Sequence, residues 1–322
     1  MVEFLTGSTV FSGLLSSPLY ALMVLLVTIP NYSLSALLIR EAIVAWKKGW
    51  ASLLAFGIAY GAINEGLMAK TYFTFQPLSP ALGSAEGVGR LFGINWPWVT
   101  GITLFHMIVS ISVPIALSFL IFPESSSQRL FGRKGTITLL GLLTLQVAVW
   151  TPFLIVFDPG LRQNLPLLAL PIGIVLVFVC LARSLPAPYL GRNLRGFVGR
   201  PIVLGAVALL FFVITFAPIL RFFAFPFIPL AKLYAGVYRL DSLGILTTFY
   251  PMVLAGLAVA FFLRYSLSEE QVLGLIAGAL FIPLVSALAP FDLPAGAPVA
   301  ALIYLVCLVA AWTKTKRRSS DS

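Results

Sequence analysis

The stretch ASLLAFGIAYGAINEGLMAK, residues 51–70, carries only two charged residues, Glu65 and the terminal Lys70. A membrane-spanning helix needs roughly 20 consecutive, predominantly apolar residues, so this stretch predicts one. Similar runs fill nearly the whole 322-residue chain, in which 60% of the residues are hydrophobic and 10% are charged. Soluble domains carry about a quarter of their residues as charged groups. The composition therefore predicts an integral membrane protein and excludes a soluble enzyme with a large core.

Outward from this stretch, apolar runs and their breakers predict an all-α, polytopic transmembrane helix bundle of about nine spans. We expect the spans at 18–45, 51–70, 97–122, 136–157, 166–185, 201–220, 242–263, 271–290 and 294–313. Residues 1–313 then form a single transmembrane helical domain, and residues 314–322 form a short basic cytoplasmic tail. Residues 221–241 leave the topology open, because they could cross the membrane or form an interfacial or re-entrant segment.

The 21 basic residues are divided unevenly between the two sets of loops. Fourteen fall in the loops and tail that include Lys47, Arg129, Arg183, Arg264 and Lys314, whereas six fall in the opposite loops. Cytoplasmic loops of membrane proteins are enriched in lysine and arginine. This bias predicts an N-terminus outside the cell and a C-terminus in the cytoplasm, and we expect a multi-pass protein of a prokaryotic cell membrane.

The lipid bilayer is the partner that the sequence predicts most directly. The net charge of +10 does not indicate nucleic acid, because the basic residues lie in loops between apolar segments and not on one soluble face. Cys180 and Cys307 both fall inside apolar stretches, and the chain has a single histidine, which leaves too few ligands for zinc. We expect no metal and no cofactor.

Residues 51–70 also contain the most informative polar positions. Gly57 and Gly61 form the small-xxx-small pattern that lets two membrane helices approach closely. Glu65 follows four residues later on the same helix face, so its carboxylate should point into protein. In the next span, His106 shares a face with Ser110. Counting about 1.5 Å per residue from the helix ends places Glu65 and His106 at similar depth.

Together with Asn64, these residues predict a polar site in the outer half of the bilayer. Glu65 and His106 are the candidate catalytic pair, because a carboxylate and an imidazole in one dry pocket can act as base and acid. Asn64, Lys70 and Ser110 are the candidate ligands for a small substrate, an ion or a proton. The same pair could instead hydrogen-bond two helices together, and the chain could be a non-catalytic scaffold or a subunit of a complex.

Two other polar pairs lie in the first span. Arg40 and Glu41 are close to its basic end, so we expect their side chains to extend to the lipid headgroups. Asn31 and Tyr32 follow Pro30, and we expect them to satisfy backbone groups that the proline frees. These four residues are therefore interpreted as structural.

Residues 65–70, Glu-Gly-Leu-Met-Ala-Lys, resemble the first motif, EExxxR, of the CAAX-protease and bacteriocin-processing family of intramembrane proteases. His106 is then similar to the histidine of the second motif, FxxxH. The resemblance implies that Glu65 is a general base and that His106 orients water or an oxyanion during peptide hydrolysis. Residues 64–123 also look similar to uncharacterised prokaryotic polytopic membrane proteins, a resemblance that implies no activity.

Overall fold

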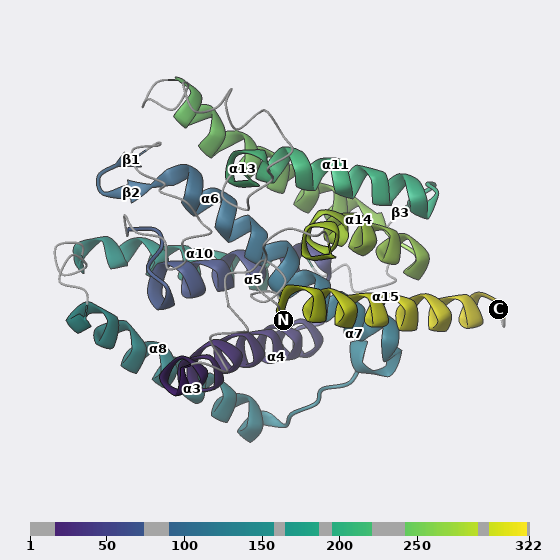
Figure 1. Cartoon of the computed structure of the whole chain (residues 1–322). Helices are drawn as coiled ribbons and strands as arrows, with labels where there is room; N and C mark the ends of the chain where they lie inside the picture. Colours follow the sequence, from purple (N-terminus) through teal and green to yellow (C-terminus); the bar gives the residue numbers. More distant parts are fainter. Residues whose placement is uncertain are drawn as a thin grey trace.

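The computed structural model describes residues 17–73, 90–157, 165–186, 195–220, 242–288 and 296–320, and nearly all of these are helical (Figure 1). The first membrane-length helix runs through α3 (Pro18–Met23), η1 (Val24–Thr28) and α4 (Ile29–Ala45). The second comprises α5 (Trp50–Gly61) and η2 (Ala62–Met68), and the third α6 (Trp96–Phe105), η4 (His106–Ser112) and α7 (Val113–Ile121).

The remaining helices complete the bundle. They are η5 (Pro123–Ser126), α8 (Arg133–Phe157), η6 (Leu165–Leu168), α10 (Ala169–Ser184), α11 (Pro201–Leu220), α13 (Ser242–Arg264), α14 (Glu269–Leu288) and α15 (Gly296–Ser320). Two short strand pairs lie between helices: β1 (Arg90–Leu91) pairs antiparallel with β2 (Ile94–Asn95), and β3 (Arg195–Gly196) pairs parallel with β4 (Tyr265–Ser266).

The structure confirms the all-α helix bundle, and each of the nine expected spans coincides with a helical segment. Seven of these segments are long and apolar enough to cross a membrane within the described residues. The other two, α11 and α13, contribute the shorter apolar stretches Pro201–Phe216 and Thr248–Arg264 to the described part. Residues 221–241 lie outside the described residues. Helix α15 continues to Ser320, so the basic tail extends the last helix.

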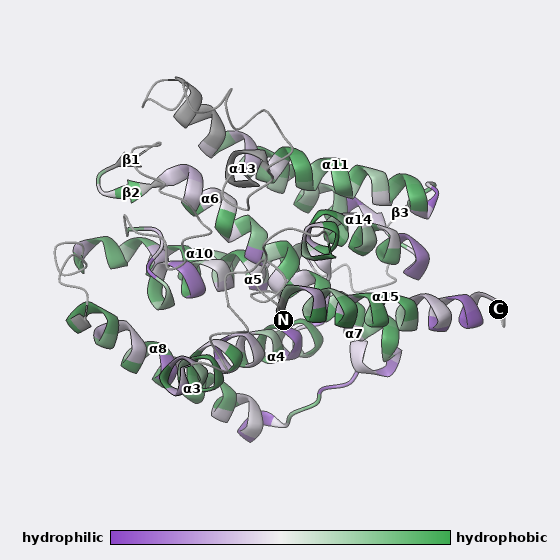
Figure 2. Ribbon diagram, viewed as in Figure 1, coloured by the Kyte–Doolittle hydropathy of each residue, from purple (hydrophilic) through white to green (hydrophobic). Residues whose placement is uncertain are grey.

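The second and third membrane-length helices form the centre of the bundle. In the most apolar part of Trp50–Met68, 89% of the residues are buried, and the figure for Trp96–Ile121 is 72%. Only 6% are buried in the corresponding part of Arg133–Val156, where α8 is largely hydrophobic (Figure 2) and exposes Ile137, Leu140 and Leu145. The exposed apolar face of α8 suits contact with lipid. A polar site needs shielding from lipid, and the two central helices provide it because most of their residues are buried.

Gly57 and Gly61 bring the central helices together, as the sequence predicts. A Cβ atom on Gly57 would lie 2.7 Å from the Cα atom of Met107, and one on Gly61 would lie 2.9 Å from the Cα atom of Thr103. Real Cβ atoms do not approach a backbone so closely, because their van der Waals surfaces would overlap. These two glycines therefore permit the close contact that places Glu65 beside His106.

A second glycine contact joins α11 to α14. A Cβ atom on Gly278 would lie 2.0 Å from the carbonyl oxygen of Gly205, and one on Gly274 would lie 2.3 Å from that of Pro201. Gly274 and Gly278 thus repeat, four residues apart, the small-xxx-small pattern of Gly57 and Gly61.

The ends of the helices that carry most basic residues gather at one end of the bundle. Lys48 Nζ donates to the carbonyl oxygen of Leu185 (2.6 Å), and Lys314 Nζ donates to that of Ile121 (2.9 Å). The C-terminal end of α15 and strand β3 both lie at this end, on the right in Figure 1, whereas β1 and β2 lie on the left. The separation of basic and less basic ends agrees with the loop assignment, and the side of the membrane that each end faces stays a prediction.

Candidate functional site

The polar residues of the predicted site lie on two π-helical segments. Asn64 and Glu65 belong to η2, and His106 and Ser110 belong to η4. The backbone amide of Ala69 donates to the carbonyl oxygen of Asn64, five residues earlier, which is the hydrogen bond that defines a π-helix. Such wide turns occur often at functional sites in helical proteins. Here the turn lets two adjacent side chains, Asn64 and Glu65, both reach His106.

The centre of the site is a direct contact between the two candidate catalytic residues. Glu65 Oε1 lies 2.7 Å from His106 Nε2, and these side chains are 8% and 4% exposed. The other ring nitrogen, His106 Nδ1, lies 2.7 Å from Ser110 Oγ. Carboxylate, imidazole and hydroxyl therefore form one continuous hydrogen-bonded chain across two central helices.

Asn64 connects this chain to the first membrane-length helix. Its Nδ2 donates to Glu65 Oε1 (2.9 Å) and lies 3.2 Å from His106 Nε2. Its Oδ1 accepts a hydrogen bond from Asn31 Nδ2 at 2.6 Å. The expectation that the Asn31 side chain repairs its own helix is wrong, because its amide nitrogen binds the side chain of Asn64. Asn31 is a polar residue within a span, and this was the only sign in the sequence that it belongs to the site. The partner of its side chain lies on another helix, so the sequence of the first helix alone does not reveal it.

Thr71 and Trp98 complete the surroundings of the Glu65 carboxylate, and the sequence analysis missed both. The Thr71 hydroxyl donates to Glu65 Oε2, and Trp98 Nε1 donates to Thr71 Oγ1 at 2.9 Å. Both carboxylate oxygens therefore accept hydrogen bonds. Thr71 follows the end of the span Trp50–Met68, so the hydrogen-bonded chain leads from the buried Ser110 to the end of a helix.

Aromatic side chains enclose the imidazole. The rings of Tyr60, Phe105 and Tyr32 have centroids 5.7, 5.9 and 6.0 Å from that of His106, and the Tyr60 ring meets it edge to face. His106 itself is only 3% exposed. An apolar enclosure strengthens the electrostatic interaction between the imidazole and the carboxylate, because little solvent screens it.

Tyr72 and Lys70 lie close in sequence to the site without joining its hydrogen-bonded chain in the described part of the protein. The Tyr72 hydroxyl bonds the hydroxyl of Thr103, and burial raises the pKa of this phenol, so it stays protonated. Lys70 is 1% exposed, and its Nζ has no hydrogen-bond partner among the described residues. Burial lowers the pKa of Lys70 to about 8. A binding role for Lys70 stays a prediction.

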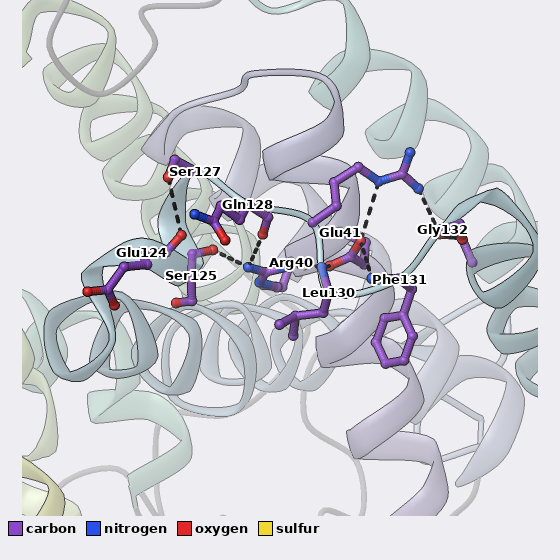
Figure 3. A network of polar contacts seen from close by, with 11 residues as sticks. Arg40, Glu41, Glu124, Ser125, Ser127, Gln128, Leu130, Phe131 and Gly132 are labelled. Carbon is purple, nitrogen blue, oxygen red and sulfur yellow. Dashed lines mark hydrogen bonds and ion pairs between the residues drawn. The ribbon is translucent and has the colours of Figure 1, made fainter.

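A second buried polar cluster lies at the other end of the first membrane-length helix (Figure 3). Glu41 forms an ion pair with Arg40 and accepts hydrogen bonds from the backbone amides of Leu130 (3.0 Å) and Phe131 (3.3 Å). Arg40 also donates to the carbonyl oxygen of Gln128 at 2.6 Å. The expectation that Arg40 and Glu41 extend to the headgroups is wrong, because their side chains are 5% and 0% exposed. The cluster anchors the segment between α7 and α8.

The chain belongs to a family of membrane proteins. The family described as "Uncharacterized membrane protein family" matches residues 4–318, which is nearly the whole sequence. No curated protein and no solved structure matches the chain. The protein is therefore an all-α membrane protein of this family, and the resemblance to the CAAX-type proteases gains no support from these comparisons.

Proposed function

We propose that the chain is a multi-pass protein of a prokaryotic cell membrane in which Glu65 and His106 bind one exchangeable proton within the bilayer. The 2.7 Å contact between Glu65 Oε1 and His106 Nε2 carries this proposal. A carboxylate and an imidazole are both groups that accept and donate protons in proteins, and intramembrane ionisable groups commonly form substrate, ion or proton sites. The distribution of basic residues between loops, together with the position of Glu65 near the end of its helix, predicts that the site lies in the outer half of the bilayer.

The completeness of the hydrogen bonds favours a proton over a larger ligand. Glu65 Oε1, Glu65 Oε2 and both ring nitrogens of His106 already have partners. A small molecule or a metal ion would have to displace Asn64 or Thr71, whereas a proton moves along hydrogen bonds that exist. Among the residues that the structure describes, no three histidine, cysteine, aspartate or glutamate side chains gather as metal ligands would.

The chain of polar groups also supplies a route for exchange. Thr71 links the Glu65 carboxylate to the end of its helix, and Trp98 holds the Thr71 hydroxyl. Tryptophan rings prefer the interface between membrane and water. We therefore place the exchange of the bound proton at the end of the bundle that carries Thr71, which the loop charges assign to the outside of the cell.

Infrared difference spectroscopy of the protein in membranes, between acidic and alkaline pH, tests this proposal. We expect carboxyl and imidazole bands to change together, because a proton bound between two groups in direct contact is shared by both. Glu65→Gln should remove the carboxyl band and change the pH of the imidazole transition. Glu124→Gln, at an exposed position, is the matched control and should leave both unchanged. A carboxyl band that persists in Glu65→Gln would contradict the proposal.

A further inference from the structure

A pocket of about 440 Å³ lies between α5, η4, α7, α11, α13 and α14, away from the hydrogen-bonded chain of the site. Among its described lining residues, Ser112 and Trp50 alone carry a hydrogen-bonding nitrogen or oxygen in the side chain. The Ser112 hydroxyl already donates to the carbonyl oxygen of Met107 at 2.7 Å. The lining therefore offers almost nothing to a polar ligand and suits an apolar one. We call this cavity the α11–α13 pocket.

The α11–α13 pocket is open toward the side of the bundle. The lining side chains of Val203, Val207 and Leu257 are 52%, 54% and 61% exposed. These residues lie on α11 and α13, in the apolar stretches Pro201–Phe216 and Thr248–Arg264. A ligand can therefore enter from the lipid, without passing through water.

The depth of the pocket matches one leaflet of a membrane. Its lining on α13 extends from Leu254 to Phe262, and the eight rises between these residues span about 12 Å along a helix. Half the hydrocarbon core of a bilayer is about 15 Å. Phe212 closes the deep end of the pocket by packing against Phe105 (6.4 Å between centroids) and Phe216 (4.5 Å). The pocket thus reaches from one end of the bundle to about the middle of the membrane.

The end of the pocket nearer the membrane surface lies beside positive charge. Phe262 lines the pocket two residues before Arg264, and Val203 lines it three residues after Arg200. Arg200 and Arg264 are both exposed. The carboxylate of Glu269, at the same end, is held by Arg318 at 2.5 Å. Glu270 lines a different groove, between α11, α14 and α15. Neither Arg200 nor Arg264 forms an ion pair with a carboxylate of the described residues, so both can bind an anionic group.

We propose that the α11–α13 pocket binds one acyl chain of an anionic phospholipid, with the headgroup at Arg200 and Arg264. The apolar lining and the one-leaflet depth select the acyl chain, and the exposed arginines select the negative headgroup. Lysine and arginine near a membrane surface attract anionic lipid in this way. This lipid site is separate from the Glu65 and His106 pair and does not depend on it.

Photocrosslinking in vesicles tests the lipid site. The probe is a phosphatidylglycerol with a photoreactive group in its acyl chain, in vesicles of phosphatidylcholine. We expect labelling concentrated on α11, α13 and α14, and competition by unmodified phosphatidylglycerol. The same acyl chain on phosphatidylcholine should label the pocket more weakly. Labelling spread evenly over exposed helices such as α8, or equal labelling by the two lipids, would overturn the proposal.

Two variants separate the acyl-chain contact from the headgroup contact. Ala258→Phe places a ring in the pocket and should abolish the labelling there, whereas Ala148→Phe, on the exposed face of α8, should not. The double variant Arg200→Gln and Arg264→Gln leaves the cavity intact and should reduce the preference for phosphatidylglycerol about tenfold or more. Arg133→Gln with Lys134→Gln is its exposed control. An unchanged preference in the Arg200 and Arg264 variant overturns the proposal even if Ala258→Phe does not fold.

Discussion

At the scale of single residues, the Glu65 carboxylate is the most connected group of the candidate site. It accepts hydrogen bonds from Asn64 and Thr71 and contacts the imidazole of His106. A buried charge without partners is costly, and so is a buried donor that loses its acceptor. The effect of a substitution at Glu65 on stability therefore depends on how many of these contacts the new side chain keeps.

Glu65→Leu should lower the free energy of unfolding by about 3 kcal/mol, because it leaves His106, Asn64 and Thr71 without their acceptor. Glu65→Gln keeps the shape and part of the hydrogen bonding, and should cost about 1 to 2 kcal/mol. Reversible unfolding in mixed micelles, followed by circular dichroism, measures both. Equal stability of Glu65→Leu and the parent protein would show that the pair contributes nothing to the fold.

Lys70 gives a prediction about pH. Burial lowers its pKa in the folded protein to about 8, from 10.5 in an unfolded chain, so the unfolded state binds more protons between these values. Stability should therefore rise as the pH increases from about 8 to about 10.5, and the penalty of the buried charge is complete below pH 8. Lys70→Met should be more stable than the parent at pH 7. The free energy of unfolding of both proteins should be measured between pH 8 and pH 10.5, and it should rise less steeply with pH in Lys70→Met. The same slope in both proteins would contradict this prediction.

The residues of the site could be predicted in part from single helices. Periodicity places Glu65 on one face with Gly57 and Gly61, and His106 on one face with Ser110, and the two glycines indicated which face meets another helix. The partners on other elements could not be found in this way. Asn31 and Thr71 join the site through the packing of the first helix and through the turn after Met68, and neither contact leaves a pattern within one helix.

At the scale of elements, glycines set the distances between helices. The spans were predictable because a run of about 20 apolar residues is long enough to cross the hydrocarbon core of a bilayer, whichever helices lie beside it. The π-helical turns η2 and η4 were not, because a wide turn has no composition of its own. The contact between α11 and α14 could have been predicted from Gly274 and Gly278, which repeat the spacing of Gly57 and Gly61.

Gly278→Leu should separate α11 from α14, because its Cβ would lie 2.0 Å from the backbone oxygen of Gly205. The expected loss is about 2 to 3 kcal/mol of unfolding free energy. Gly256→Leu is the matched control, since nothing lies within 4 Å of its Cβ position on α13. Thermal unfolding of the two variants checks the difference. A loss of the same size in both would mean that the close contact between α11 and α14 is not the cause of the effect, since leucine has the higher helix propensity and should not itself destabilise a helix.

At the scale of the whole molecule, the basic ends of the helices gather at one end of the bundle. This arrangement follows because successive spans cross the membrane in opposite directions, which brings every second loop to the same end. Which end faces the cytoplasm is predicted only from the bias of lysine and arginine between the loops. The match to the membrane protein family covers residues 4–318, and therefore includes all of these helices except the last two residues of α15.

Cysteine labelling tests the direction. In a background with Cys180 and Cys307 replaced by alanine, Phe92→Cys lies at the end of the bundle with β1 and β2, and Ser320→Cys lies at the end of α15. Phe92 is 79% exposed. A maleimide that does not cross membranes should label Phe92→Cys in intact cells, and should label Ser320→Cys only after the cells are opened. The opposite pattern would invert the topology.

The proton proposed between Glu65 and His106 is tested most directly by nitrogen NMR. His106 is the only histidine of the chain, so ¹⁵N-histidine labelling of the protein, with a purification tag that lacks histidine, reports this residue alone. We predict that its ring nitrogens change protonation state with pH while the protein stays folded, that Glu65→Gln alters this titration, and that Ser110→Ala changes mainly the Nδ1 signal. A single protonation state at every pH at which the protein remains folded would contradict the proton site and leave the pair as a contact between helices.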